Sequence, residues 1–535
     1  MKKNQSWKRF AAGALATMML VSLTACGGSA GKATSSTEGA TTDSASASSK
    51  TQLNVGVSNL VSSVLNPAAD SSGTGFTRAG IGESLMICDT KGELKPWLAE
   101  SVESKDNVNW VVKLKADTKF SNGNVCDAAA VMKSLQYLTD NNKGLGKSLN
   151  IESMEVADAT TLNIVTNGVT SDFLSYLSHP QSAIQDVTAA DMDNAPVGTG
   201  PYKVDKFISQ QEIDLSANTN YNNGIVNFKT VHYIESHDAD ALWLQLQSGE
   251  LDMLVSPSST NISSIKGDDT YAVASSSLTT RDRYLIYNLE SNYTSNVNFR
   301  KGIDCLIDRK TIVETVMGGL AVEGVGCIPT GYSATPDYVG TSFDVKKALS
   351  YFEAAGLTVK DGKVSDNGAA ISLKYHTYDS FPELSTIVQF IQSSLATVGI
   401  NAEVTSTADD IDDYLGNEAN SGSWDISMAS MFAVPRGDAA YILNTSYDTN
   451  SQYNYSTTRV PDDTLQNLIQ SIKVTVDSKE RENLIKEAAL RVEEMCYISY
   501  YMNPTFNIVY NTKTIDNVTS YGSEQYFVND GITAK

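Results

Sequence analysis

The sequence predicts an α/β protein built from two lobes. Two widely separated stretches, residues 228–255 and residues 371–404, each read in the order strand, helix, strand. This order is typical of the unit that builds a parallel sheet. Because the two stretches lie far apart in the chain, we expect each to form a sheet in a lobe of its own.

The first stretch begins with an expected strand at residues 228–235. Asp238 stands where its carboxylate would cap a helix over residues 238–247. Residues 251–255 then form a short apolar strand. These three elements make up one strand-helix-strand unit.

The second stretch begins with a strand at residues 371–378, in which apolar residues alternate with polar ones. In residues 383–398 the apolar side chains recur every three or four positions, which predicts a helix. Gly399 ends this helix, and a strand resumes at residues 400–404. We expect residues 424–431 to add a further strand beside this unit.

The rest of the chain carries isolated signals for strands and helices. The expected elements are a hairpin-like strand at 109–115, a helix at 128–138, a strand at 283–288, one continuous helix at 299–317, a helix at 345–355 capped by Asp344 and ended by Gly356, a helix at 479–495 and a β-prone run at 497–501.

The first 25 residues have the layout of a secretory signal. Basic residues precede an apolar segment at residues 10–23, which is shorter than the ~20 residues that span a bilayer. The segment ends in Leu23-Thr24-Ala25-Cys26, which resembles the lipobox of bacterial lipoproteins. This resemblance implies that residues 1–25 are removed and that Cys26 is diacylated and anchors the protein. The alternative is a secreted protein cleaved after Ala25 with an unmodified Cys26.

Residues 26–50 are rich in Ser, Thr, Gly and Ala and contain no large apolar side chain, so they predict a flexible tether. Both interpretations of Cys26 place the protein outside the cytoplasm. We expect it to be lipid-anchored at the outer face of the cell membrane, or periplasmic.

The net charge of −22 excludes partners that are themselves acidic. The signal carries four basic and no acidic residues, so the mature protein is more acidic still. Such a surface repels nucleic acid and anionic lipid. We expect no nucleic-acid partner, and contact with the membrane only through the lipid anchor.

The sequence contains no recognisable catalytic or cofactor motif, so we expect no enzyme activity, no metal site and no cofactor. His232 and His237 would point to opposite faces of a strand. Residues 146–148 match the end of a phosphate-binding loop, but the segment follows a helix where such a loop requires a strand. The cysteines other than Cys26 are scattered and odd in number, which favours small buried side chains.

Three groups of motifs resemble one family, the solute-binding proteins of peptide and nickel ABC importers. They are PWLAES at 96–101 with TKFSNG at 118–123, GTGPYK at 198–203, and the segment 298–310, which begins NFRKGI and ends IDRK. The resemblance implies a periplasmic-binding-protein-like (Venus flytrap) fold with mixed sheets flanked by helices. It further implies that a ligand is enclosed between the lobes by hinge closure and delivered to a membrane permease driven by an ATPase.

The same resemblance implies a division of the chain. Lobe I takes residues 51–280, including an inserted subdomain, lobe II takes residues 281–496, and residues 497–535 return to lobe I. We expect the protein to act as a monomer.

The resemblance leaves the ligand open between a short peptide and a nickel or other metal chelate. Peptide-binding members hold the ligand's amine with an aspartate where this chain has Pro435. The nickel branch uses arginines where our alignment places Gln136 and Gln181. The chain therefore departs from both branches.

The residues suggest a site made from both lobes. Phe432 offers an aromatic face, and Arg436 offers a fork for a ligand carboxylate. Phe76 and Arg78 are the candidates from the first lobe. The alternative is that Arg436 is a solvated loop residue and Phe432 belongs to the core, and we expect Asp438 to order the loop.

Two other functions remain open on sequence alone. The first is an extracellular ligand sensor on the same fold. The second is a secreted hydrolase that would use the acidic cluster at residues 409–413, for which an acidic surface stretch is the simpler explanation.

Overall fold

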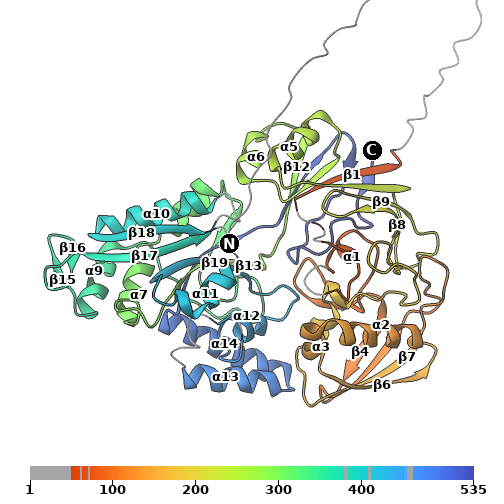
Figure 1. The fold of residues 1–535 in the computed structure, drawn as a ribbon, viewed down its shortest axis with the longest axis horizontal. Coiled ribbons are helices and arrows are strands. Elements are labelled where there is room, and N and C mark those ends of the chain that lie inside the picture. Colours follow the sequence, from red (N-terminus) through yellow and green to blue (C-terminus); the bar gives the residue numbers. More distant parts are fainter. Residues whose placement is uncertain are drawn as a thin grey trace, which may run out of the picture. The chain divides into compact units, whose positions relative to one another are not determined.

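Two large mixed sheets organise the chain (Figure 1). The computed structural model describes residues 50–58, 60, 63–69, 73–378, 383–407, 411–451, 453–454 and 462–535. The signal segment, Cys26 and the tether up to residue 49 lie outside the described residues, as do residues 409 and 410 of the acidic cluster.

The first sheet has seven strands, and several of them lie beside strands that are distant in the sequence. In spatial order these are β12 (Tyr271–Ser275), β21 (Asn507–Asn511), β11 (Met253–Val255), β1 (Gln52–Val57), β10 (Thr230–Glu235), β9 (Glu212–Ala217) and β8 (Tyr202–Ile208).

The second sheet has six strands. In spatial order these are β14 (Ala321–Glu323), β20 (Ile498–Pro504), β13 (Arg281–Tyr287), β19 (Ile426–Phe432), β17 (Ile371–Tyr378) and β18 (Ile400–Thr407).

Smaller sheets complete the strand set. The order β4 (Ala99–Ser104), β5 (Asn109–Leu114), β7 (Thr161–Thr166), β6 (Ile151–Asp158) forms an antiparallel sheet, and the two-stranded pairs are β2 (Met86–Cys88) with β3 (Leu94–Pro96), β15 (Thr358–Lys360) with β16 (Lys363–Ser365), and β22 (Ile515–Asp516) with β23 (Thr533–Ala534).

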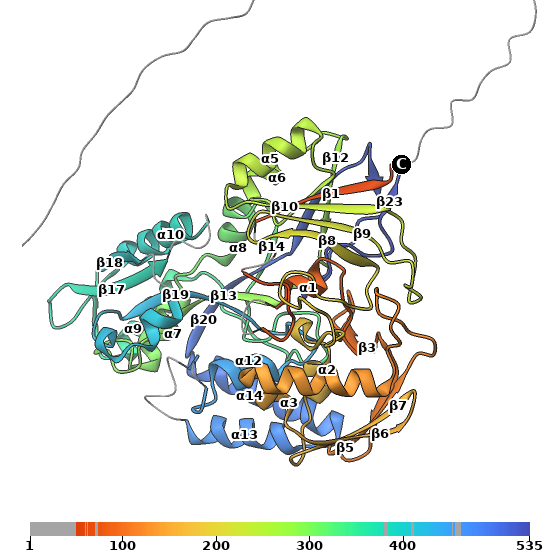
Figure 2. The same cartoon turned by 45° about the vertical axis from the view of Figure 1, so that its right-hand side comes forward.

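The helices flank these sheets, and in both ribbon views α5 and α6 lie together on one side of the seven-stranded sheet (Figures 1 and 2). The helices are α1 (Gly75–Arg78), α2 (Ala128–Asn141), α3 (Lys143–Leu149), α4 (Phe173–Leu177), α5 (Ala239–Ser248), α6 (Ser259–Ser264), α7 (Val297–Asp304), α8 (Arg309–Thr311), α9 (Val345–Ala354), α10 (Leu384–Thr397), α11 (Ile411–Gly416), α12 (Ala440–Ser446), α13 (Asp463–Val474) and α14 (Ser478–Met495), with short 3₁₀ turns at Pro180–Ser182 and Glu418–Asn420 and a π turn at Ile312–Val316.

The second strand-helix-strand unit is confirmed as β17, α10 and β18, with β17 and β18 parallel. The further strand is also present, because β19 pairs with β17 in parallel. The first unit is present as β10, α5 and β11, but β1 lies between its two strands and runs parallel to both. Local periodicity does not carry that information, since β1 is distant in the sequence.

The chain crosses between the two large sheets twice, from β12 to β13 and from β20 to β21. The crossings lie side by side: Ser276 N donates to Phe506 O at 2.9 Å, and Phe506 N donates to Ser276 Oγ at 3.0 Å. The run expected at residues 497–501 is β20, and it belongs to the six-stranded sheet. The chain therefore returns to the seven-stranded sheet at residues 505–506 rather than at residue 497.

The single helix expected at residues 299–317 is wrong, because the structure divides it into α7, α8 and a π turn. Asp308 caps a new helix start by accepting from Thr311 N at 3.0 Å. The Arg309 guanidinium donates to Asp304 O at 3.2 Å and to Tyr500 O at 2.8 Å. The bond to Asp304 O takes over a carbonyl that a continuous helix would use, and the bond to Tyr500 O fixes Arg309 to β20.

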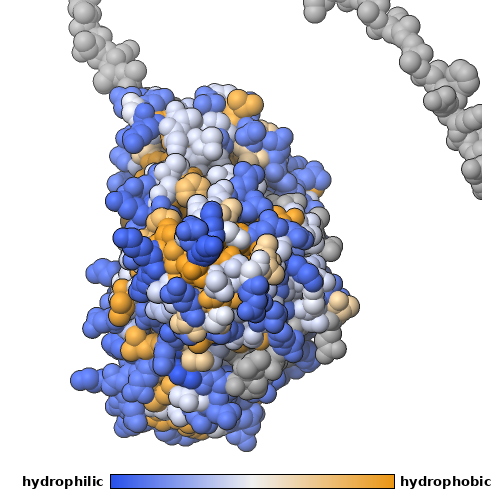
Figure 3. Space-filling view, turned by 90° about the vertical axis from the view of Figure 1, so that its left-hand side faces the viewer, coloured by the Kyte–Doolittle hydropathy of each residue, from blue (hydrophilic) through white to orange (hydrophobic). Residues whose placement is uncertain are grey.

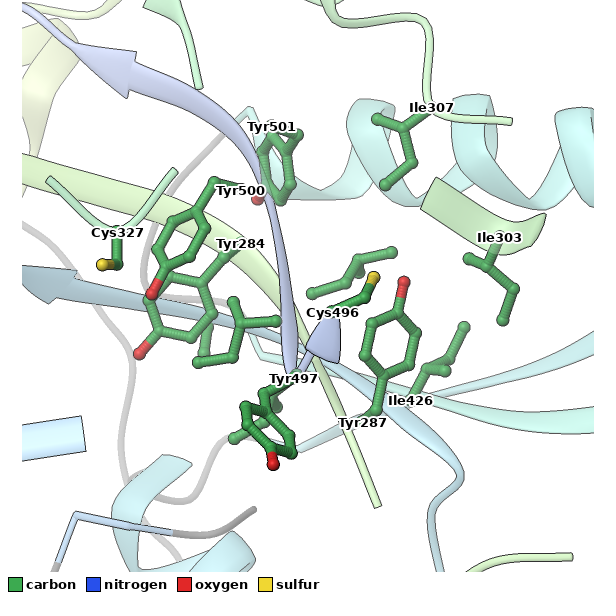
Figure 4. Close-up of a cluster of buried hydrophobic side chains, with 14 of the residues drawn as sticks. Tyr284, Tyr287, Ile303, Ile307, Cys327, Ile426, Cys496, Tyr497, Tyr500 and Tyr501 are labelled. Carbon is green, nitrogen blue, oxygen red and sulfur yellow. The ribbon is translucent and has the colours of Figure 1, made fainter. Parts of the chain in front are cut away.

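Each large sheet has its own hydrophobic core. Figure 4 shows part of the core beside β13 and β20, where Tyr284, Tyr287, Tyr500 and Tyr501 gather. Two of these hydroxyls are hydrogen-bonded: that of Tyr287 to Ser499 Oγ at 2.6 Å, and that of Tyr500 to Tyr447 Oη at 2.7 Å. The four-stranded sheet has a further core, shared with α2.

The described cysteines, which are Cys88, Cys126, Cys305, Cys327 and Cys496, are all free and buried, as expected. Among the described residues no group of His, Cys, Asp and Glu has the geometry to hold a metal ion, and none of the helices is long and apolar enough to cross a membrane. The face in Figure 3 is mainly hydrophilic, with apolar residues grouped near its middle.

Candidate ligand-binding site

Arg436 lies in the loop between β19 and α12, and only 9% of its surface is exposed. Its guanidinium carbon lies 5.6 Å from the ring centre of Tyr176 on α4 and 4.8 Å from that of Tyr441 on α12. Among the described residues its side chain has no hydrogen-bond acceptor, and Nε is buried without a partner. A positive charge therefore sits between aromatic rings with most of its water removed and with no described carboxylate hydrogen-bonded to it.

Two other buried arginines of the described chain, Arg300 and Arg309, have every guanidinium nitrogen hydrogen-bonded. Arg300 donates to Cys496 O at 2.8 Å and to Met495 O at 2.6 Å. Arg309 donates to Tyr500 O and to Asp304 Oδ1 at 2.5 Å. Arg436 differs from Arg300 and Arg309 because its guanidinium donates no hydrogen bond to a described residue.

The two acidic neighbours of Arg436, Asp438 and Asp172, differ in the direction in which the pKa of their carboxyls is shifted. Asp438 accepts both terminal guanidinium nitrogens of Arg481 at 2.9 Å and Ala440 N at 3.0 Å, which confirms that it orders the loop. Burial opposes the charge on Asp438, but the Arg481 ion pair outweighs burial and lowers its pKa. Burial, and next the charge of Asp438, raise the pKa of Asp172 to about 6. Asp172 is therefore the acid near Arg436 whose charge changes close to neutral pH.

His179 is the neutral polar group of this region. Burial, and next the charge of Arg436, hold the pKa of its imidazole well below the usual value. Nδ1 accepts from Gln181 N at 3.1 Å, so the neutral ring carries its proton on Nε2. Gln181 is itself buried, and its Nε2 donates to Ala69 O at 2.8 Å.

A second group connects the six-stranded sheet to α1 and to the irregular segment around Glu524. Arg78 Nε donates to Glu524 O at 3.1 Å, and the Glu524 carboxylate accepts from Arg281 Nε at 3.4 Å and Nη2 at 3.3 Å. The Arg281 guanidinium lies over the Phe432 ring, with 3.8 Å between its carbon and the ring centre. Arg78 and Phe432 are thus linked through Glu524 and Arg281, and their part in a shared ligand site stays a prediction.

The other two predicted contacts lie elsewhere in this conformation. Phe76 has 0% exposure, and its ring packs so closely on Gly82 that a Cβ there would lie 1.8 Å from the Phe76 Cε1 atom. Gln136 is exposed on α2, where Nε2 donates to Asp140 Oδ1 at 3.3 Å. Phe76 packs a core and Gln136 bonds within its own helix, and neither joins the Arg436 group or the Glu524 group.

Sequence reasoning missed Arg281, Glu524, Tyr176 and Tyr441. One usable signal was the pattern Arg281-Asp282-Arg283 at the start of a strand, since alternation places both arginines on one face. Asp282 faces the other way and is fully buried, with Oδ1 accepting from Asn503 Nδ2 at 2.5 Å. Glu524 lies in an irregular segment far along the chain, where no local pattern points to it.

Comparison with known proteins identifies the class of molecule that carries this site. A model of bacterial extracellular solute-binding proteins, family 5, matches residues 93–454. The chain belongs to this family. The protein therefore binds a solute and is not an enzyme, as expected from the motifs.

Individual relatives agree with the family. The nickel-binding protein NikA of Staphylococcus aureus is 28% identical over 430 residues, covering 79% of this chain and 84% of its own. The glutathione-binding protein GsiB of Escherichia coli strain K12 is 26% identical over 434 residues, covering 76% and 80%.

Solved structures confirm the fold. A nickel ABC transporter protein of Bacillus halodurans superposes with a TM-score of 0.79 at 30% identity, covering 90% of this chain and 100% of its own. NikA from Staphylococcus aureus in complex with Ni(L-His)2 superposes with a TM-score of 0.74 at 25% identity, covering 91% and 100%. The α/β fold with mixed sheets expected for this family 5 protein is thus confirmed.

Proposed function

We propose that this protein is the substrate-binding lipoprotein of an ABC importer and that it captures a carboxylate-bearing ligand, either a nickel chelate or a short peptide. The similar proteins support this range, since one is named for nickel, one for glutathione, and one was solved with Ni(L-His)2. Histidine and glutathione both carry carboxylates, and the free donors of Arg436 suit such a group.

Arg436 is the observation that carries the proposal. Arg436 is only 9% exposed, and a buried guanidinium with no acceptor among the described residues costs free energy that a bound carboxylate would remove. Hydrogen bonds between charged groups contribute about 1.5–3 kcal/mol each. The rings of Tyr176 and Tyr441 exclude water, which strengthens the contact.

The Glu524 group supplies the second half of the proposed site. Arg78 bonds the backbone carbonyl of Glu524, Arg281 bonds the Glu524 carboxylate, and the Phe432 ring lies against the Arg281 guanidinium. A ligand with a second anionic group would compete with Glu524 for Arg281. Gln181 lies beside His179 and offers its amide oxygen, so we include it as a polar contact.

The proposed mechanism is closure of two lobes about the paired crossing strands at residues 276–280 and 505–506. Lobe I would hold residues 51–280 and the end of the chain, and lobe II the six-stranded sheet. Ligand contacts from both lobes exist only in the closed state and so favour it. Diacylated Cys26 and the tether at residues 26–50 would keep this receptor near its permease.

A ligand panel tests the proposal. We expect Ni(II) with L-histidine, glutathione, or one of a set of di- to hexapeptides to raise the melting temperature with concentration. Arg436→Met should weaken that ligand about tenfold or more, since it removes a charged hydrogen bond. Lys479→Met, at an exposed position on α14, removes the same charge and should leave the affinity unchanged.

Two results would count against the proposal. A panel without any specific ligand would reject the substrate range. A ligand that binds Arg436→Met and the native protein equally would reject the site.

A further inference from the structure

A small cavity lies next to β8, the edge strand of the seven-stranded sheet. Its lining contains no residue of the Arg436 and Glu524 groups described above. Its volume is about 100 Å³, and its lining includes the rings of Trp97, Tyr202, Tyr221, Tyr521 and Tyr526. This is far below the roughly 300–1,000 Å³ of sites for larger ligands. The cavity therefore has room for one compact group.

Two of the other rings meet the Tyr526 ring edge to face. The Tyr526 ring centre lies 5.1 Å from that of Trp97 with the planes at 85°, and 5.3 Å from that of Tyr521 with the planes at 73°. Tyr526 is 6% exposed and Tyr202 is 3% exposed, so two of the walls are fixed by packing. Trp97 and Tyr521 are only partly buried, which leaves the cavity accessible.

The charges around the cavity are negative. Asp530 is exposed and belongs to the lining, and among the described residues its carboxylate has no hydrogen bond or ion pair. Its charge contributes, after burial, to the raised pKa of Tyr521, so the carboxylate and that wall are close. Among the residues that line the cavity in the described chain there is no lysine or arginine.

A second acid, Glu83, is hydrogen-bonded to residues that line the cavity. Glu83 is 1% exposed and accepts from Asn223 Nδ2 at 2.6 Å and from Tyr221 Oη at 3.4 Å, both from residues that line the cavity. Lys115 reaches the amide oxygen of Asn223 without lining the cavity itself. The electrostatic character of the site is therefore set by Asp530 and by the aromatic rings, since Glu83 with its pKa of about 7 is only partly ionised at neutral pH.

We infer that this cavity is a second binding site, which takes the alkylated ammonium group of a small organic cation. Ring faces attract a cation through their quadrupoles, and the attraction grows when the cation loses water. The free carboxylate of Asp530 adds a direct charge contact at the opening. A neutral group of the same shape would fill the cavity but would gain neither the attraction to the rings nor the contact with the Asp530 carboxylate.

The test compares choline with its neutral carbon isostere 3,3-dimethylbutan-1-ol by isothermal titration calorimetry on the full chain. We expect choline to bind and the neutral isostere to bind at least about fivefold more weakly. Asp530→Asn should weaken choline about fivefold, and Tyr521→Leu should weaken it as well. Asp240→Asn, a matched loss of charge at an exposed position on α5, should have no effect.

Each other outcome overturns the inference. If choline does not bind, the proposed site is rejected. If the neutral isostere binds as tightly as choline, recognition of the positive charge is rejected. If the native protein and Asp530→Asn bind choline with equal affinity, the proposed role of the Asp530 carboxylate is rejected. Choline binding that disappears in Arg436→Met would place the cation in the other site. Should Tyr521→Leu fail to fold, Asp530→Asn decides alone, because Asp530 is exposed.

Discussion

Glu83 should make the stability of this protein fall as the pH rises through the neutral range. It is 1% exposed, and burial raises its pKa from 4.5 to about 7, while hydrogen bonds from Asn223, Thr199 and Tyr221 oppose the rise. In the unfolded chain the carboxyl ionises near its ordinary pKa of 4.5. The native state therefore holds the proton more tightly than the unfolded state does.

The sign and size follow from this difference. Below pH 4.5 both states are protonated, so the contribution of Glu83 is fully present. As the pH rises through 7 the contribution is lost, because the unfolded chain gains the ionised form first. A pKa of about 7 against 4.5 corresponds to about 3 kcal/mol, at 1.36 kcal/mol for each tenfold change in proton affinity.

The assay is urea unfolding of the native protein and of Glu83→Gln at several pH values between 4.5 and 7.5. The amide keeps the size of the side chain and cannot ionise. We expect the native protein to lose about 3 kcal/mol relative to the variant across this range. Glu100→Gln, at an exposed strand position, is the control for loss of one charge. Parallel pH profiles for the native protein and Glu83→Gln would refute the reasoning.

Three further changes test other parts of the structure. Asp172→Asn should tighten an anionic ligand at pH 8 and have little effect at pH 5, where Asp172 with its pKa of about 6 is already neutral; calorimetry at both pH values checks this. Gly200→Ala should lower the free energy of unfolding by about 1–3 kcal/mol in urea, because its Cβ would lie 2.7 Å from the carbonyl carbon of Ile81. Asp438→Asn should lower the melting temperature, since it breaks the buried ion pair with Arg481 and costs about 3 kcal/mol.

The elements that were predictable from sequence are those whose signals are local. β17, α10 and β18 follow directly from strand and helix periodicities, and Gly399 marks the junction. The division of the expected helix at 299–317 depends instead on Arg309, whose side chain bonds a carbonyl of β20 that lies 191 residues away. No window of neighbouring residues contains that partner.

The candidate site divides in the same way. Arg436 and Phe432 could be named as candidates because they lie four residues apart, at the end of β19 and in the loop after it, in a stretch that resembles a family motif. The ion pair of Arg281 with Glu524 joins residues 243 positions apart, and Glu524 has no periodicity around it. The burial of Phe76 is likewise a property of the packed core, since its ring fills the space that Gly82 and Gly198 leave open.

The GTGPY motif at residues 198–202 acts through backbone contact and one hydroxyl rather than through a ligand. A Cβ on Gly198 would lie 2.2 Å from Ile81 O, so only glycine lets the two segments meet. Gly200 N then donates to Ile81 O at 2.9 Å, and the hydroxyl of Thr199 donates to Glu83 Oε2 at 2.9 Å. The motif thereby fixes a buried acid whose other donors line the aromatic cavity. A sequence signature that identifies the family thus also positions the part of the molecule that carries the inferred cation site.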